Sequence, residues 1–344
     1  MDKEKQLQLI ERLADRMVYG GDADWAMNIG QFDWVPGVGL YGIWHAWQST
    51  RKEAYLKFLV DWMQIHLKEA ALQKTVNSTA PLLTTIELYK MTQSPAYLQT
   101  CRAIADYVIH EAPLTREGGL EHTVTEAVPG FKEQIWADTL FMVCIFLTKL
   151  SRVTGEERYQ DFALTQLEIH HKVLRDAATG LYYHGWNCGA GNHMSAVHWG
   201  RANAWILYST VEILADTGKL KEKGEWVQSQ AAALRACQRE NGAFGTILDD
   251  ADSYDELSAT AGIAAGLAKA IREGILDETY GAMLQQAIKA VTENVNAAGE
   301  LEGVSTGTPI MPDAQAYKEI PLCPTLYGQG LAILALSEDY KTER

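Results

Sequence analysis

The sequence predicts an all-α protein with the (α/α)6 barrel fold, built from six helical hairpins. Helical patterns recur along the 344 residues, whereas strand patterns are scarce. The predicted helices also alternate in character, because segments with few charges follow segments that are charged on one face. A helix without a polar face must be buried, so this alternation predicts a ring of buried helices inside a ring of half-exposed ones. The repeated hairpin predicts one domain over residues 1–344.

The outer helices are recognised by a charged face opposite an apolar one. Residues 157–164 show the type, because their apolar side chains recur on a single helical face. In chain order, the predicted outer helices span residues 3–18, 52–68, 95–110, 156–173, 221–238 and 278–296.

The inner helices are largely apolar and carry few charges. The most apolar stretch, residues 134–147, is predicted to form one helix that is apolar nearly all round, with Asp138 close to its start. In chain order, the predicted inner helices span residues 40–47, 80–89, 135–147, 202–211, 259–267 and 331–336.

The starts of the inner helices share small, aromatic and polar residues, and in such a barrel they gather at one end. Helix N-termini carry unpaired N–H groups and a positive dipole end, which favour a carboxylate ligand. The longest connections, about residues 113–133, 174–198 and 297–324, are predicted to cover this mouth, because long loops in a compact domain are often binding elements.

Composition limits the partners and the compartment. The formal charge of −14 argues against nucleic acid or an anionic membrane as a partner, since both require a basic surface. Residues 1–10 lack the apolar core of a signal peptide, and no apolar run is long enough for a convincing membrane span. The five scattered cysteines are typical of reduced thiols, so we expect a cytoplasmic protein. The sequence assigns no oligomeric state.

Asp138 is the candidate catalytic residue. It could cap a helix, because Asp is a favoured N-cap residue. The residues before it also fit a helix, however, and those after it are strongly apolar. A carboxyl group buried there is expected to have a raised pKa, which would make it a usable general acid.

Two further polar residues stand at inner-helix starts. Arg201 precedes a low-charge helix and requires an anionic partner, either a ligand carboxylate held through two hydrogen bonds or an internal glutamate. Asn77 precedes the second inner helix and is predicted to cap it, to face the cavity, or to do both.

Aromatic residues gather at the same helix starts and in the adjoining loops. Core packing is the ordinary role of a single tryptophan, but as a set beside Tyr41 and Tyr327 they are typical of a wall on which sugar rings stack. The tryptophans in question are Trp34, Trp44, Trp136, Trp186, Trp199 and Trp205.

The loop after residue 182 contains His184, Cys188, His193 and His198, but their spacing matches no established zinc pattern. His184 is interpreted as a hydrogen-bonding residue of the pocket. The nearby segment 189–191 lacks the lysine and Ser/Thr of a phosphate-binding loop. We therefore expect no metal and no cofactor.

Taken together, these residues resemble the unsaturated rhamnogalacturonyl hydrolases, glycoside hydrolase family 105. The matching segments occur in the family's order and span nearly the whole chain. They are Gly39-Leu40-Tyr41-Gly42, Gly118-Gly119-Leu120-Glu121-His122, Gln134-Ile135-Trp136-Ala137-Asp138, Tyr183-His184-Gly185-Trp186, Trp199-Gly200-Arg201-Ala202-Asn203-Ala204-Trp205 and Tyr327-Gly328-Gln329-Gly330.

The resemblance implies a small anionic substrate, a lyase product whose non-reducing uronic acid has a C4–C5 double bond, and an aglycone that is rhamnose. It implies that Asp138 protonates C4 and assists water at C5, and that Arg201 holds the uronate carboxylate. The remaining substrate-binding residues that it implies are Tyr41, Asn77, His122, Trp136, His184, Trp199, Trp205 and Tyr327.

Two positions depart from the family pattern. Family members often have Asp where this chain has Asn77, and commonly have Lys where it has Thr123. Lys132 is a candidate substitute for that lysine. An amide at position 77 suggests a role in orienting the substrate or Asp138.

Three other functions are compatible with the same barrel. One is conventional glycoside hydrolysis by two carboxylates, with Asp138 paired to Asp33, Glu121 or Glu256. Another is hydrolysis of unsaturated glucuronyl sugars, as in family 88. The third is a carbohydrate-binding protein without catalysis.

Overall fold

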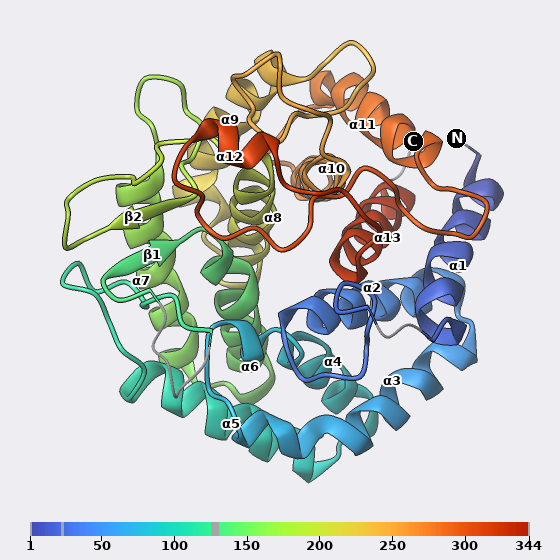
Figure 1. The fold of residues 1–344 in the computed structure, drawn as a ribbon. Coiled ribbons are helices and arrows are strands. Elements are labelled where there is room, and N and C mark those ends of the chain that lie inside the picture. Colours follow the sequence, from blue (N-terminus) through green and yellow to red (C-terminus); the bar gives the residue numbers. More distant parts are fainter. Residues whose placement is uncertain (1, 22–23, 125–130, 343–344) are drawn as a thin grey trace.

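The computed structural model describes residues 2–21, 24–124 and 131–342, and within them it confirms the predicted (α/α)6 barrel. Figure 1 looks into the barrel, with one ring of helices enclosed by another. The inner ring consists of α2 (Trp34–Thr50), α4 (Leu82–Thr92), α6 (Ile145–Thr154), α8 (Gly200–Asp216), α10 (Leu257–Arg272) and α13 (Leu326–Lys341). The outer ring consists of α1 (Lys3–Tyr19), α3 (Glu53–His66), α5 (Pro95–His110), α7 (Glu157–Leu174), α9 (Leu220–Cys237) and α11 (Gly281–Glu293).

Burial separates the two rings as the charge pattern predicts. In α8, every residue from Gly200 to Leu214 is buried, so this helix has no solvent face. In α7, the buried residues recur every three or four positions, from Tyr159 to Leu174, and therefore lie on one face. The inner helices thus form the hydrophobic core, and the outer helices cover it with one face each.

The ring closes where the last helix, α13, packs against the first inner helix, α2. At the contact the two backbones are so close that a Cβ on Gly42 would lie 2.5 Å from the Cα of Gly330. Glycine at both positions lets the helices approach more closely than any side chain would permit.

The prediction of one helix over residues 134–147 is wrong. Residues Gln134–Trp136 form strand β1, which pairs antiparallel with β2 (Gly185–Asn187). A π-helical turn, η3 (Leu140–Cys144), follows, and regular α-helix starts only at Ile145. The apolar run alone could not reveal a partner strand 49 positions further along the chain, which decides the conformation.

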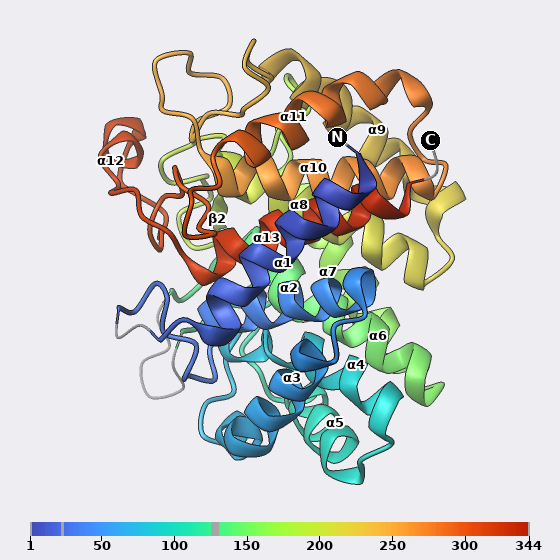
Figure 2. The same cartoon turned by 90° about the vertical axis from the view of Figure 1, so that its right-hand side faces the viewer.

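The long connections lie together at one end of the barrel, on the left in Figure 2 with β2 and the short helix α12 (Ala314–Lys318). Buried glutamines of the helices hold them. On α7, Gln166 accepts from Leu120 N and donates to Gly118 O; on α13, Gln329 accepts from Leu301 N and donates to Gly299 O. The remaining short helices are η1 (Leu67–Ala71), η2 (Asn77–Thr79) and η4 (Glu278–Tyr280). Among the described residues, no helix is long and apolar enough to cross a membrane.

Candidate active site

Asp138 lies between β1 and η3, at the mouth of the barrel. The pairing of Trp136 with Gly185 and the hydrogen bond from Ala137 N to His184 O (3.0 Å) fix the backbone immediately before it. The π-helical turn immediately after it replaces a regular helix start. Such π-helical turns are rare, and those that occur are often found at functional sites.

The environment of Asp138 stabilises its anion. Its side chain is 16% exposed, and the Nε2 of His184 lies 3.4 Å from its Oδ2. Burial raises the pKa of Asp138, but the nearby His184, His122 and Arg201 outweigh burial and bring the pKa below its ordinary value. The expectation of a raised pKa is therefore wrong, because burial came together with positive and hydrogen-bonding neighbours.

Neighbouring side chains fix the ring of His184. Its Nδ1 lies 2.7 Å from the hydroxyl of Tyr317, and its ring packs against Trp199 with centroids 4.1 Å apart. Burial lowers the pKa of His184, so the imidazole is neutral near pH 7. The segment before it is fixed by Asn203, whose side chain accepts from Tyr182 N and donates to Tyr182 O.

Arg201, at the start of α8, is fully buried and richly bonded. Its guanidinium lies over the rings of Trp199 and Tyr327, and its Nη1 is 3.4 Å from Glu256 Oε1. The internal salt bridge, one of the two alternatives that the sequence allowed, therefore exists, and its glutamate caps α10. The other acceptors are Ser258 Oγ, Ser305 O and Oγ, Thr306 O and Thr308 Oγ1.

A cavity of about 230 Å³ opens above these residues. His122 and Trp199 in its wall each carry a buried polar atom without a hydrogen-bond partner among the described residues, Nδ1 and Nε1 respectively. Such atoms are costly unless a ligand or water satisfies them, so they mark this cavity as the functional site. The complete lining is Trp25, Trp34, Asn77, His122, Val124, Phe131, Trp136, Asp138, Met142, Trp199, Arg201, Gly307, Thr308 and Pro309.

Comparison with known proteins identifies the family. Residues 9–343 match Glycosyl Hydrolase Family 88. The chain belongs to this family. The chain is 35% identical to the unsaturated rhamnogalacturonyl hydrolase YesR of Bacillus subtilis (strain 168), in an alignment that covers 100% of this chain and 97% of that protein. It is therefore a glycoside hydrolase, as predicted.

Solved structures agree with this family 88 assignment. A possible member of the GH105 family from Salmonella enterica superposes with a TM-score of 0.94 at 31% identity, covering 99% of this chain and 95% of that one. The match supports the resemblance to family 105. The unsaturated glucuronyl hydrolase of Bacillus sp. GL1 superposes with a TM-score of 0.78 at 16% identity, covering 97% and 96% of the two chains, and shares the fold.

The structure brings seven of the predicted site residues of this family 88 chain to the cavity wall: Trp34, Asn77, His122, Trp136, Asp138, Trp199 and Arg201. His184 and Tyr327 lie directly behind that wall. Tyr327 stacks on Trp34, with centroids 4.8 Å apart, and donates to Ser305 O. Tyr41 and Trp205 are fully buried, do not line the cavity, and pack around Phe141.

The two departures from the family pattern lie next to each other. Asn77 is in η2, and the N-cap of α4 is Pro81, so Asn77 does not cap that helix. The hydroxyl of Thr123 accepts from Val76 N (3.3 Å), which joins its segment to that of Asn77. Lys132 is exposed and does not line the cavity.

Several lining residues carried no sequence signal of their own. Phe131 and residues 307–309 lie in two of the connections predicted to cover the mouth, but nothing within those connections marked them. Trp25 lies beside Gly307, where a Cβ would meet its ring at 2.7 Å. Met142 comes from the π-helical turn, which the helical interpretation of this segment could not anticipate.

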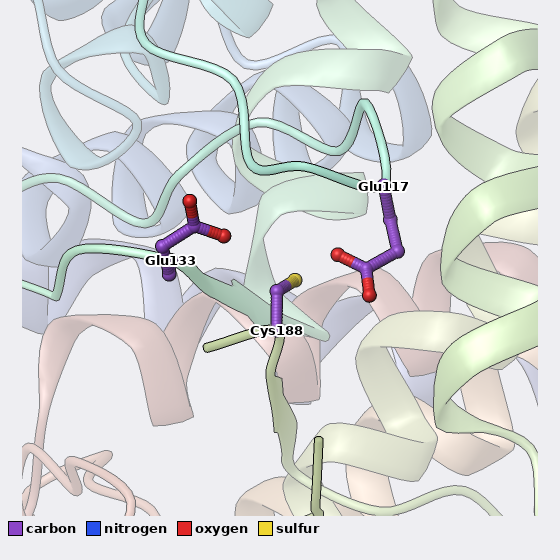
Figure 3. A group of neighbouring side chains, drawn as sticks. All are labelled: Glu117, Glu133 and Cys188. Atoms are coloured by element: carbon purple, nitrogen blue, oxygen red, sulfur yellow. The ribbon is translucent and has the colours of Figure 1, made fainter. Parts of the chain in front are cut away.

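Outside the cavity, Glu117, Glu133 and Cys188 place one potential metal-ligand atom each within 4.8 Å of one another (Figure 3). These groups already have partners. Glu133 pairs with Arg116 (3.3 Å), and Glu117 accepts from Trp186 Nε1 (3.5 Å). Burial and the neighbouring Glu117 raise the pKa of Cys188 to about 11, which keeps the thiol protonated.

The histidines of the same loop also have separate partners. His193 contacts Val173 O through Nε2 at 2.7 Å, and His198 lies between Asp249 and Asp176. Each of these rings is therefore held by its own neighbours.

Proposed function

We propose that this family 88 protein hydrolyses unsaturated galacturonyl–rhamnose disaccharides by hydration of the C4–C5 double bond, with Asp138 as general acid and base. The observation that carries the proposal is that Asp138 is the one carboxylate among the described residues that line the cavity. The likeness over the full chain to an unsaturated rhamnogalacturonyl hydrolase supports the substrate class.

Hydration of an enol ether requires one group that gives a proton and then takes one. The lowered pKa leaves Asp138 ionised near neutral pH. An anionic uronate bound beside it would raise that pKa by like-charge repulsion, so the carboxyl group would take up a proton as substrate binds. Substrate binding would thus convert Asp138 into the acid.

The proposed steps balance as the addition of one water. Asp138 gives its proton to C4 and then accepts a proton from the water that attacks C5. The new hydroxyl makes C5 a hemiketal, which opens to a ketone by breaking its bond to the ring oxygen. The ring oxygen stays on C1 and takes up the proton that the C5 hydroxyl loses, so C1 becomes a hemiacetal. Collapse of this hemiacetal to an aldehyde releases the rhamnose.

Arg201 is proposed to attract the uronate carboxylate. Its Nη2 donates to Thr306 O (3.2 Å) and Thr308 Oγ1 (3.1 Å), both in the connection that forms one wall of the cavity. The guanidinium therefore holds that wall while its positive charge faces the ligand. The aromatic rings of Trp34, Trp136 and Trp199 are proposed to contact the sugar faces.

Paired-carboxylate hydrolysis finds less support. The three carboxylates that could pair with Asp138 are engaged elsewhere and do not line the cavity. Asp33 accepts from Trp34 N, Glu121 accepts from Glu133 N, and Glu256 accepts from Ala259 N and faces Arg201. Each of these carboxylates has its own hydrogen-bond or ion-pair partners. A mechanism that uses Asp138 alone is therefore simpler.

The test follows the ultraviolet band of the conjugated uronate in an unsaturated galacturonyl–rhamnose disaccharide. We expect the band to disappear with the wild type, and Asp138→Asn to lose roughly 10²–10⁴-fold in rate while still binding substrate. Asp33→Asn is the matched control and should retain activity, because asparagine also caps helices.

Other results would redirect the assignment. Release of rhamnose with the band intact would exclude hydration and favour paired carboxylates. Faster turnover of an unsaturated glucuronyl disaccharide would change the substrate. Binding of both sugars without turnover would indicate a carbohydrate-binding protein.

A further inference from the structure

Tyr317 is a fully buried tyrosine that reaches the site from α12. Its hydroxyl lies 2.7 Å from His184 Nδ1, the nitrogen on the side of the ring away from Asp138. Three contacts fix the short helix: Asp313 accepts from Ala316 N (2.9 Å), Tyr254 donates to Tyr317 O (3.2 Å), and Lys318 pairs with Asp250 (2.5 Å).

The short contact between Tyr317 and His184 requires one proton between oxygen and nitrogen. A neutral imidazole carries a proton on one nitrogen, so one ring nitrogen donates and the other accepts. A carboxylate at Asp138 favours the proton on Nε2, the nitrogen that faces it at 3.4 Å. Nδ1 must then accept, and the Tyr317 hydroxyl must donate.

We propose that Tyr317 is a positioning residue: it donates a hydrogen bond to His184 Nδ1 and thereby holds the Nε2–H toward Asp138. The catalytic consequence rests on the proposed function above, whereas the position of the proton does not. Without the tyrosine hydroxyl, the proton of His184 could move to Nδ1, and a lone pair on Nε2 would face the carboxylate.

The contact between Tyr317 and His184 also connects a loop to Asp138. The connection that carries Tyr317 contributes residues 307–309 to the cavity wall, so the same segment contacts both the ligand space and His184. The titratable or charged groups that face Asp138 are His184, His122 and Arg201, and Asp138 in turn faces Tyr317. Of these, His184 has the ring nitrogen whose protonation Tyr317 can set.

The decisive measurement is the protonation of the His184 ring nitrogens, read from two-bond 1H–15N correlation spectra of protein labelled at histidine. Comparison with His184→Gln assigns the signals. We expect the wild type to carry the proton on Nε2, and Tyr317→Phe to shift the populations toward Nδ1. Tyr159→Phe is the control. Tyr159 is a buried residue of the outer helix α7, and its hydroxyl lies 2.9 Å from Asp106, so the variant removes a hydroxyl that has no contact with His184.

Kinetics supply the second readout. We expect Tyr317→Phe to lower kcat roughly tenfold, with a much smaller change in KM, because Tyr317 does not line the cavity. Loss of the Nε2–H donor would raise the pKa of Asp138, so the limb of the kcat/KM profile that Asp138 sets should move to higher pH. A merely structural role would lower activity without moving that limb.

Wild-type protein with its His184 proton on Nδ1 would overturn the proposal, and this result does not depend on whether Tyr317→Phe folds. An unchanged nitrogen pattern in a folded Tyr317→Phe variant would overturn it as well. If the wild type leaves the double bond of unsaturated uronyl substrates intact, the proposed function fails, while the spectra still decide the role of Tyr317.

Discussion

The imidazole of His122 lies parallel to the indole of Trp136, with ring centroids 4.1 Å apart and an angle of 2° between the planes. Phe131 lies 4.5 Å from the same indole, and Trp136 Nε1 donates to Gln134 Oε1 (2.9 Å). The stack joins the connection before β1 to the strand that ends next to Asp138. It leaves His122 Nδ1 buried in the cavity wall, without a hydrogen-bond partner in the part of the chain that the structure describes.

We predict that His122→Asn lowers kcat/KM by roughly 10- to 100-fold, because a stacking surface and a polar contact of about 1.5–3 kcal/mol are lost. The pKa of His122 is lowered to about 4, chiefly by burial. It is therefore neutral from pH 5 to 8 and becomes charged only below that range. Between pH 5 and 8 the variant should keep the shape of the wild-type pH profile; a change of shape would show that His122 titrates there. His110→Asn, at the end of the outer helix α5, is the control.

We predict that Arg201→Lys destabilises the protein by roughly 3–5 kcal/mol, because an ammonium group cannot reach all the acceptors and leaves the buried Glu256 poorly compensated. Denaturant unfolding measures the loss. Arg158→Lys, whose side chain is 44% exposed and pairs with Asp106, should cost less than about 1 kcal/mol. Equal losses of stability in the two variants would refute the prediction that Arg201 contributes more to stability than Arg158 does.

We predict that stability falls as the pH drops from 4.5 toward 2, in part through Glu338 on α13. Burial raises the pKa of this carboxyl group, but Lys341, His45 and Arg272 lower it more, to about 2. Because the folded pKa lies below the ordinary value of 4.5, protons bind the unfolded chain more tightly. The stabilisation is complete above pH 4.5 and is lost on acidification.

Unfolding free energies measured across that pH range test this prediction. Glu338→Gln should be less stable at pH 7 by roughly 3–5 kcal/mol, since Arg272 and Lys341 lose their anion, and should show a weaker dependence on pH. Glu293→Gln, at an exposed pair with Lys289, is the control and should leave the acid limb unchanged. If Glu338→Gln and the wild type lose the same stability between pH 4.5 and 2, Glu338 is excluded as a source of the acid destabilisation.

We predict that Gly330→Ala costs about 1–3 kcal/mol, because its Cβ would lie 2.3 Å from Val38 O and push α13 away from α2. Thermal unfolding checks this. Gly281→Ala on α11 has no neighbour within 4 Å and should be neutral or stabilising. A neutral Gly330→Ala would mean that the two helices can separate without cost.

The alternation of apolar and amphipathic segments predicted the barrel, because burial of each helix depends on its own residues. The outer helix predicted at 95–110 is found at Pro95–His110, and that predicted at 221–238 at Leu220–Cys237. The inner helices extend further than predicted, since α2 begins at Trp34 rather than at residue 40. Its first turn holds Pro36 and Gly37, which weaken a helical pattern but are tolerated at a helix start.

The sequence by itself determined the two rings and the residue types at the mouth: an acid, an arginine, histidines and aromatic rings. The tertiary structure alone decided that residues 134–136 form a strand, because the partner strand at Gly185–Asn187 is distant in sequence. It also decided that Tyr41 and Trp205 pack beneath the cavity, and that the pKa of Asp138 is lowered instead of raised. Periodicity is a local property, whereas strand pairing, cavity lining and electrostatic stabilisation depend on groups that only folding brings together.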